Sequence, residues 1–297
     1  MVLALRESEP AAAGDPAGRA QEPVRPVPGH LSPSSAVLFE QCPRRWRFRY
    51  LDRLPDPPGQ AALVGTFVHR ILERLLGEEP AARTLDRARA IAAEEWPAHH
   101  QQDDVVALGL DGDGIRRYKW QVWQAVHGLW QLEDPAAVDV VATEQRLDVP
   151  LGAVPFLGVL DRVESTTEGV VVSDYKSGRA PAAAYVADKL DQVLLYAAAW
   201  SAGGGAQPKR ARLLYLGARS IEVEVTPGRM DEAVGRLHQR WDALNNCVRD
   251  ERFEPRTGPL CAWCPFAAQC PEGSREIRRR LDAGLVPAHA PAVSAVA

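Results

Sequence analysis

Residues 170–178, with the sequence VVVSDYKSG, constrain the fold more than any other part of the chain. Three β-branched residues in succession favour a strand, and the Ser-Gly pair after the lysine is typical of a turn. Because side chains on a strand alternate between faces, Asp174 and Lys176 point to one side and Tyr175 to the other. An acid and a lysine at the end of a buried strand suit metal-assisted hydrolysis. An exposed ion pair on an edge strand would give the same pattern.

The rest of the chain mixes strand and helix periodicities. Strands are predicted at residues 140–149, 156–163, 170–175, 211–216 and 221–225. Helices are predicted at residues 33–42, 61–76, 84–96, 115–132, 181–200 and 227–248. With no repeat and no long linker between these elements, we expect one compact α/β domain.

The turn between the second and third strands allows a prediction of register. Residues 165–169 read STTEG, which is a hairpin-turn composition. If the turn is centred between Thr167 and Glu168, equal offsets place Asp161 opposite Asp174, with Cβ atoms roughly 5 Å apart. Two carboxylates so close repel each other unless a divalent cation lies between them. The register therefore predicts a metal site, provided that no β-bulge shifts it.

Composition restricts the functional class. The chain is 46% hydrophobic and 25% charged, and no apolar run is long enough to span a membrane. Its start has no basic region followed by an apolar core, so we expect a cytoplasmic protein without a secretory signal. The formal net charge of −4 argues against a uniformly basic nucleic-acid surface. Residues 1–29 and 283–297 are predicted to be a disordered leader and tail around one domain, residues 30–282.

A basic and aromatic segment follows the first predicted helix. Residues 44–50 read RRWRFRY, four arginines interleaved with three aromatics. Arg44, Arg45 and Arg47 are candidate DNA-binding residues, because arginine neutralises phosphates and exposed aromatics stack on unpaired bases. Alternatively, the aromatics face the core and the arginines are simply solvated.

Other helical residues are candidates with an ordinary structural alternative. His69 and Glu73 are spaced to lie on one face of a helix, although a lone helical histidine is usually structural. The helix predicted at residues 115–132 carries three tryptophans, and Trp123 and Trp130 lie two turns apart. That spacing favours a packing stripe over a base-stacking platform.

Four of the five cysteines predict a metal staple. Cys261, Cys264 and Cys270 have Cys-x2-Cys-x5-Cys spacing, and Cys42, which precedes a proline at the start of the fold, is the better fourth ligand. Cys247 lies on a predicted helix and is expected to be a free core cysteine. Four thiolates suit either a [4Fe–4S] cluster or a structural Zn²⁺, and spacing does not separate the two. Either group would join the first helix to the C-terminal segment and restrict the unfolded chain.

Taken together, these motifs resemble the RecB-family exonucleases of the PD-(D/E)XK nuclease superfamily, in the branch with an iron–sulfur staple. The resemblance spans residues 31–271 and is carried by Leu31-Ser32-Pro33-Ser34, Cys42-Pro43, Gly65-Thr66-x-x-His69-x-x-x-Glu73, Gly158-x-x-Asp161-Arg162-Val163, Asp174-Tyr175-Lys176-Ser177-Gly178, Gln192-x-x-x-Tyr196 and the terminal cysteines. It implies a restriction-endonuclease-like α/β core, in which helices flank a mixed central sheet. A helical insertion and a C-terminal Fe–S-stapled segment would complete the domain.

The resemblance also implies roles for individual residues. Ligands of Mg²⁺ or Mn²⁺ would be His69, Asp161, Asp174 and the backbone carbonyl of Tyr175. Lys176 would position or activate the attacking water and stabilise charge on the phosphate. Gln192 and Tyr196 would organise the site and contact DNA. The cluster ligands would be Cys42, Cys261, Cys264 and Cys270.

The predicted function is a metal-dependent exonuclease that hydrolyses single-stranded DNA or DNA ends in repair or recombination. The chain has no Walker-type Gly-x4-Gly-Lys-Ser/Thr motif, so a helicase acting in trans is the expected partner where strands must be separated. Two alternatives remain open: a non-catalytic, zinc-stapled DNA-binding module with a nuclease-like fold, and a nuclease serving CRISPR adaptation.

Overall fold

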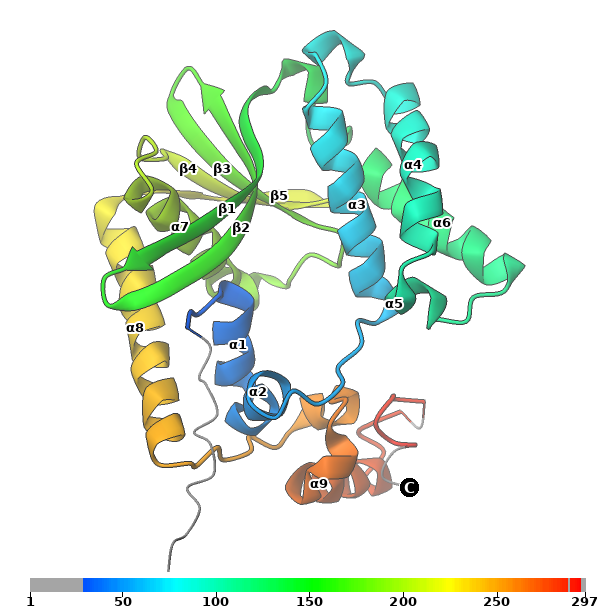
Figure 1. The fold of residues 1–297 in the computed structure, drawn as a ribbon, viewed down its shortest axis with the longest axis vertical. Coiled ribbons are helices and arrows are strands. Elements are labelled where there is room, and N and C mark those ends of the chain that lie inside the picture. The colour runs from blue at the N-terminus through cyan, green and yellow to red at the C-terminus, as the bar shows by residue number, and fades with distance from the viewer. Residues whose placement is uncertain (1–28, 288, 295–297) are drawn as a thin grey trace, which may run out of the picture.

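The computed structural model describes residues 29–287 and 289–294, so almost all of the predicted leader lies outside the described residues (Figure 1). A five-stranded sheet with the order β1-β2-β3-β4-β5 forms its centre. Neighbouring strands are antiparallel except β3 and β4, which are parallel. The strands are β1 (Asp139–Leu151), β2 (Val154–Thr166), β3 (Gly169–Lys176), β4 (Arg210–Tyr215) and β5 (Arg219–Glu224). The mixed sheet and all five predicted strands are confirmed.

Helices cover both faces of the sheet and divide the interior into two main cores (Figure 1). The larger core includes side chains from α1 (Pro33–Gln41), α2 (Pro43–Tyr50), α7 (Val186–Ala202) and α8 (Pro227–Arg249). The second core lies on the other side, among α3 (Gln60–Leu76), α4 (Leu85–His100), α5 (Asp103–Val106) and α6 (Gly112–His127). α7 connects the parallel strands β3 and β4, as a crossover must. This arrangement is the predicted restriction-endonuclease-like α/β fold.

Helix α4 continues to His100, although the sequence predicts that it ends at residues 96–97. Pro97 lies inside the helix and lacks the N–H that would continue the hydrogen-bond ladder. The buried ring of His99 stacks on Phe67 with centroids 4.2 Å apart, and its Nε2 lies 2.7 Å from the Tyr118 hydroxyl. Tertiary packing of the last turn therefore overrides the local stop signal.

Helix α6 begins and ends earlier than predicted. The Asp111 side chain accepts the N–H of Gly114 at 2.6 Å and caps the first turn. At the other end, the helix stops before Gly128, where a Cβ would overlap the backbone of Gly217. The close approach of these two glycines brings the end of α6 against the β4–β5 turn.

The C-terminal segment forms a third, small core around α9 (Pro271–Asp282). Val286, Ala290 and Val293 are buried there against Ile277. The N–H of Ala292 donates to the carbonyl of Ala262 at 3.0 Å. Within the predicted tail, Val286, Ala290, Ala292 and Val293 are thus buried in this core, whereas Leu285 is 59% exposed.

Among the described residues, no helix is both long and apolar enough to cross a membrane.

Candidate functional site

The β2–β3 hairpin has the register that the turn composition predicts. Its ladder runs from Thr166–Gly169 to Arg162–Ser173, so the same offset places Asp161 and Asp174 at the next position. Their carboxylates are almost fully buried, at 6% and 3% exposure. Oδ2 of Asp161 accepts the backbone N–H of Tyr175 at 2.6 Å. This hydrogen bond therefore fixes Asp161, on β2, beside the end of β3, where Asp174 lies.

Helix α3 brings His69 to these carboxylates. Its Nδ1 lies 3.3 Å from Oδ1 of Asp161, and its Nε2 lies 3.2 Å from the carbonyl oxygen of Tyr175. Burial lowers the pKa of His69, but hydrogen bonds to Asp161 and Glu144 more than offset it and raise the pKa to about 10. The two ring nitrogens of His69 thus face carboxylate oxygens on one side and a carbonyl oxygen on the other. Of the predicted ligand set, His69, Asp161 and the Tyr175 carbonyl are in direct contact, and the Asp174 carboxylate, on the neighbouring strand, faces Lys176 and Gln192.

A further acid at this site, Glu144 of β1, was not predicted. Ligand atoms of His69, Glu144 and Asp161 lie within 4.8 Å of one another, and Oε1 of Glu144 is 3.7 Å from Nδ1 of His69. Glu144 has a φ of 45°, in the left-handed region that non-glycine residues seldom adopt. Strained backbone of this kind tends to occur at functional sites.

The sequence did contain a signal for Glu144. β1 and β2 are joined by a tight turn at Gly152, which has a φ of 60°, and the pair that closes the turn is Leu151–Val154. Equal offsets from this turn place Glu144 opposite Asp161, by the same reasoning that pairs Asp161 with Asp174. The β2–β3 hairpin alone predicts only the pair Asp161–Asp174, and the β1–β2 hairpin is needed to add Glu144 to it.

Helix α7 supplies polar partners for Asp174 and Lys176. Nζ of Lys176 lies 2.6 Å from Oδ2 of Asp174 and donates to Oε1 of Gln192 at 3.1 Å. The Gln192 amide in turn donates to Oδ1 of Asp174 at 2.8 Å and to the Tyr196 hydroxyl at 3.3 Å. Burial raises the pKa of Asp174, and the negative charge of Asp161 raises it further, whereas Lys176 lowers it.

Gly158, one of the residues of the predicted motif, is required by the position of Tyr196. A Cβ at Gly158 would lie 2.6 Å from a ring carbon of Tyr196. The tyrosine ring can therefore pack on β2 only where the strand has no side chain. This contact helps to hold the part of α7 that carries Gln192.

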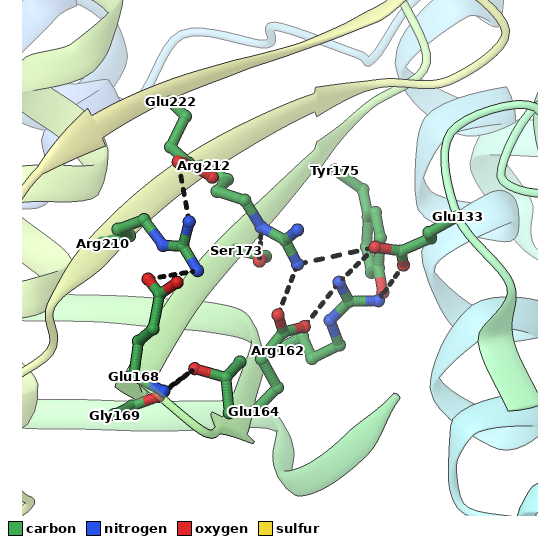
Figure 2. Close-up of polar contacts among 11 residues, drawn as sticks. Glu133, Arg162, Glu164, Glu168, Gly169, Ser173, Tyr175, Arg210, Arg212 and Glu222 are labelled. Carbon is green, nitrogen blue, oxygen red and sulfur yellow. Dashed lines mark hydrogen bonds and ion pairs between the residues drawn. The ribbon is translucent and has the colours of Figure 1, made fainter. Parts of the chain in front are cut away.

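A buried ionic network surrounds Arg162 (Figure 2). Because side chains alternate along a strand, Arg162 and Tyr175 point to the opposite face of the sheet from Asp161 and Asp174. The fully buried guanidinium of Arg162 donates to the Tyr175 hydroxyl at 2.9 Å and to Oε2 of Glu133 at 3.0 Å. Glu164 accepts from Arg212 at 2.6 Å and also pairs with Arg162 at 2.7 Å. The network immobilises the side chain of Tyr175, and with it the strand end whose carbonyl faces His69.

Two of the three predicted DNA-binding arginines, Arg44 and Arg45, lie beside the cysteines. Nε of Arg44 donates to the carbonyl of Phe253 at 2.8 Å, and Arg47 pairs with Asp52 at 3.2 Å. Arg44 and Arg45 also line the pocket that holds the cysteines. Trp46 is fully buried, as in the alternative that places the aromatic side chains in the core.

All four cysteines of the predicted staple line this one pocket: Cys42, Cys261, Cys264 and Cys270. Backbone N–H groups of Arg256, Gly258 and Gly273 donate to three of the sulfur atoms, at 3.4, 3.4 and 3.3 Å. Burial raises the pKa of the Cys264 thiol, while a backbone hydrogen bond from Phe266 and the charge of Arg45 oppose that rise. The fifth cysteine, Cys247, is half-buried on α8 against the larger core.

Comparison with known proteins identifies the class. The chain belongs to the PD-(D/E)XK nuclease superfamily, whose family model matches residues 30–271. It is therefore a member of a family of metal-dependent nucleases that act on DNA. A solved structure described as SSO0001 is similar at 16% sequence identity and a TM-score of 0.33, covering 82% of this chain and 86% of that chain. A comparison with curated proteins finds no significant match.

Proposed function

We propose that this chain is a cytoplasmic, metal-dependent exonuclease of the RecB type that hydrolyses single-stranded DNA or DNA ends in repair or recombination. The observation that carries the proposal is the convergence of His69, Asp161 and Asp174 beside Lys176 at the end of β3. Because the chain has no Walker-type motif, a helicase in trans would have to separate duplex strands.

The residues of this site fit a divalent cation. Carboxylate and carbonyl oxygens are the donors that Mg²⁺ and Mn²⁺ prefer, and one imidazole completes the set. Oδ2 of Asp174 is buried and accepts no well-aligned hydrogen bond, although it lies close to Nζ of Lys176. We assign His69, Asp161, Asp174 and the Tyr175 carbonyl as ligands, with Glu144 as an additional one. The bound cation would neutralise phosphate charge and make water a better nucleophile.

The role assigned to Lys176 is to stabilise the transition state of phosphodiester hydrolysis. Asp174 and Gln192 hold its ammonium group from two sides, at 2.6 and 3.1 Å. A positive charge fixed in this way stabilises negative charge that builds on the phosphate without costly reorganisation. Gln192 and Tyr196 act through these contacts as positioning residues.

Substitutions of Glu144 measure separately the contribution of its carboxylate to metal binding and the effect of its positive φ on stability. Glu144→Gln should weaken Mn²⁺ binding by at least about 10-fold, because loss of even a hydrogen-bonding partner of a ligand costs that much. Glu144→Ala and Glu144→Gly both remove the carboxylate, but only glycine tolerates the positive φ, so the glycine variant should be more stable by about 1 kcal/mol. Calorimetric titration with Mn²⁺ and urea unfolding measure the two effects. Unchanged Mn²⁺ affinity in Glu144→Gln would remove Glu144 from the ligand set.

We also propose that the four cysteines hold a [4Fe–4S] cluster. In a tetrahedral zinc site with Zn–S bonds near 2.3 Å, thiolate sulfurs lie about 3.8 Å apart. Among the described cysteines, no three sulfur atoms lie within 4.8 Å of one another. The backbone N–H groups aimed at the sulfurs are the kind of contact that tunes such clusters. The cluster would supply a covalent link between α2 and the C-terminal segment.

A comparison of linear with circular single-stranded DNA tests the exonuclease proposal. Wild-type protein purified anaerobically should digest linear single-stranded DNA only when Mg²⁺ or Mn²⁺ is present, and EDTA should stop the reaction. A circular single strand of the same sequence should resist, and blocking the 5′ or the 3′ end should identify the polarity. Cleavage of the circle would replace exonuclease by endonuclease action. No cleavage of either substrate by metal-loaded protein would indicate a non-catalytic DNA-binding module.

A further inference from the structure

A cleft adjoins the candidate site on the side of α3 and α6, which lie together in Figure 1. It encloses about 670 Å³ and is lined by the start of α3, by one side of α6 and by Ser177 and Gly178, which directly follow Lys176.

Trp120 of α6 borders this cleft and is 62% exposed. The packing stripe predicted for this helix is confirmed for Trp123 and Trp130, which pack against the second core, but Trp120 takes no part in it. A large flat apolar ring at the rim of a cleft can stack on a ligand that has a flat apolar surface.

The lining of the cleft is polar but uncharged. Side-chain amides project from Gln60, Gln121, Gln124 and Gln131, and every other lining residue is uncharged too. Phosphates are bound mainly by lysine and arginine, so this cleft is poorly suited to a phosphate backbone. An amide offers both donors and an acceptor, which suits the edges of nucleobases. Gln60 and Gln121 already bond to each other at 2.8 Å and still retain free donors and acceptors.

The cleft lies close to the chemistry. A Cβ at Gly65 would be 3.0 Å from Oγ of Ser177, so α3 packs directly against the residues that follow Lys176. Val64 lines the cleft, and His69 lies five residues further along the same helix, which is about 7.5 Å at 1.5 Å per residue. That distance corresponds to about two stacked nucleotides at 3.4 Å each.

We propose that this cleft is a subsite for unpaired nucleobases next to the scissile phosphate, with Trp120 stacking on one base and the glutamines contacting base edges. The inference rests on the proposed nuclease function and names its substrate as a single strand rather than a duplex. Stacking is tolerant of sequence, because every base has a flat face.

Binding to single-stranded DNA tests the subsite independently of cleavage. All variants are made in a Lys176→Met background, and affinity for a labelled oligothymidylate is measured by anisotropy. Trp120→Ala should weaken binding by about 5- to 100-fold, the range for loss of one stacked base, while Trp120→Phe should retain most of the affinity. The matched control is Val106→Ala, which removes an apolar side chain of similar exposure, 61%, from α5. Its affinity should equal that of the parent.

Two further measurements identify the interaction as stacking. Against an oligonucleotide with abasic sites, Trp120→Ala should bind as the parent does, because no base is present to stack. The dependence of affinity on salt should have the same slope in both proteins, since no phosphate contact is lost. Equal affinity of Trp120→Ala and the parent for normal DNA would overturn the subsite. If wild-type protein cleaves no DNA but Trp120→Ala still weakens binding, the subsite stands and the nuclease proposal fails.

Discussion

Asp174→Asn is expected to lower the rate of DNA cleavage by at least about 1,000-fold, the effect of losing several kcal/mol of transition-state stabilisation. The substitution keeps the shape of the side chain but removes the charge that faces Lys176 and Asp161. Cleavage of end-labelled single-stranded DNA at saturating Mg²⁺ or Mn²⁺ measures the effect. Asp188→Asn is the matched control, since Asp188 is exposed on the first turn of α7.

Lys176→Met separates catalysis from binding at the same site. Methionine fills the space of the lysine stem but lacks the ammonium group that Asp174 and Gln192 hold. We expect kcat to fall by about 100- to 1,000-fold, as for loss of one preorganised donor, with Mn²⁺ affinity and DNA affinity nearly unchanged. Lys189→Met, at an exposed position of α7, is the control. Digestion at the wild-type rate by both Asp174→Asn and Lys176→Met would refute the assigned mechanism.

Cys264→Ser should have the largest effect on stability. Loss of one of the four ligands should remove the iron and sulfide and release the C-terminal segment from the pocket around Cys42. By analogy with a cross-link that closes a loop of 100 residues or more, we expect a loss of roughly 4 kcal/mol in the free energy of unfolding. Metal analysis, the visible absorption spectrum and urea unfolding measure the two parts of the prediction.

Cys247→Ser is the matched control for the cluster. Cys247 is half-buried on α8 and lies outside the pocket that holds the other four cysteines. Its substitution should leave the iron content unchanged and should cost only the packing of one small side chain. Stoichiometric zinc without iron in the anaerobically purified wild-type protein would rule out the iron–sulfur cluster, and loss of iron in Cys247→Ser would contradict the ligand assignment.

The sequence predicted the parts of the site that depend on short-range geometry. A hairpin with a tight turn fixes its own register, so the pairing of Asp161 with Asp174 followed from counting residues. His69 was placed only through the resemblance, because the packing of α3 on the end of the sheet depends on contacts far apart in the sequence. Glu144 was within reach of the same counting, but its backbone, with a φ of 45°, departs from an ordinary strand.

Other features depend on tertiary packing that local patterns do not report. Pro97 is a stop signal in isolation, and α4 passes it because His99 packs on Phe67. Spacing alone could not separate the exposed Trp120 from the partly buried Trp123, since both lie on α6 three residues apart. Helix α6 packs against α3, and the position of α3 therefore determines which side of α6 faces the second core.

Helix α3 carries His69 and also forms one wall of the cleft beside Trp120. A single rigid element therefore meets both the cation and the unpaired bases. Ligands that bind at two places on one element are thermodynamically linked wherever each of them shifts its position. On the roles proposed here, single-stranded DNA should raise the affinity for Mn²⁺, and Mn²⁺ should raise the affinity for single-stranded DNA by the same factor. The enzyme would then hold its cation most tightly when a strand is present to be cut.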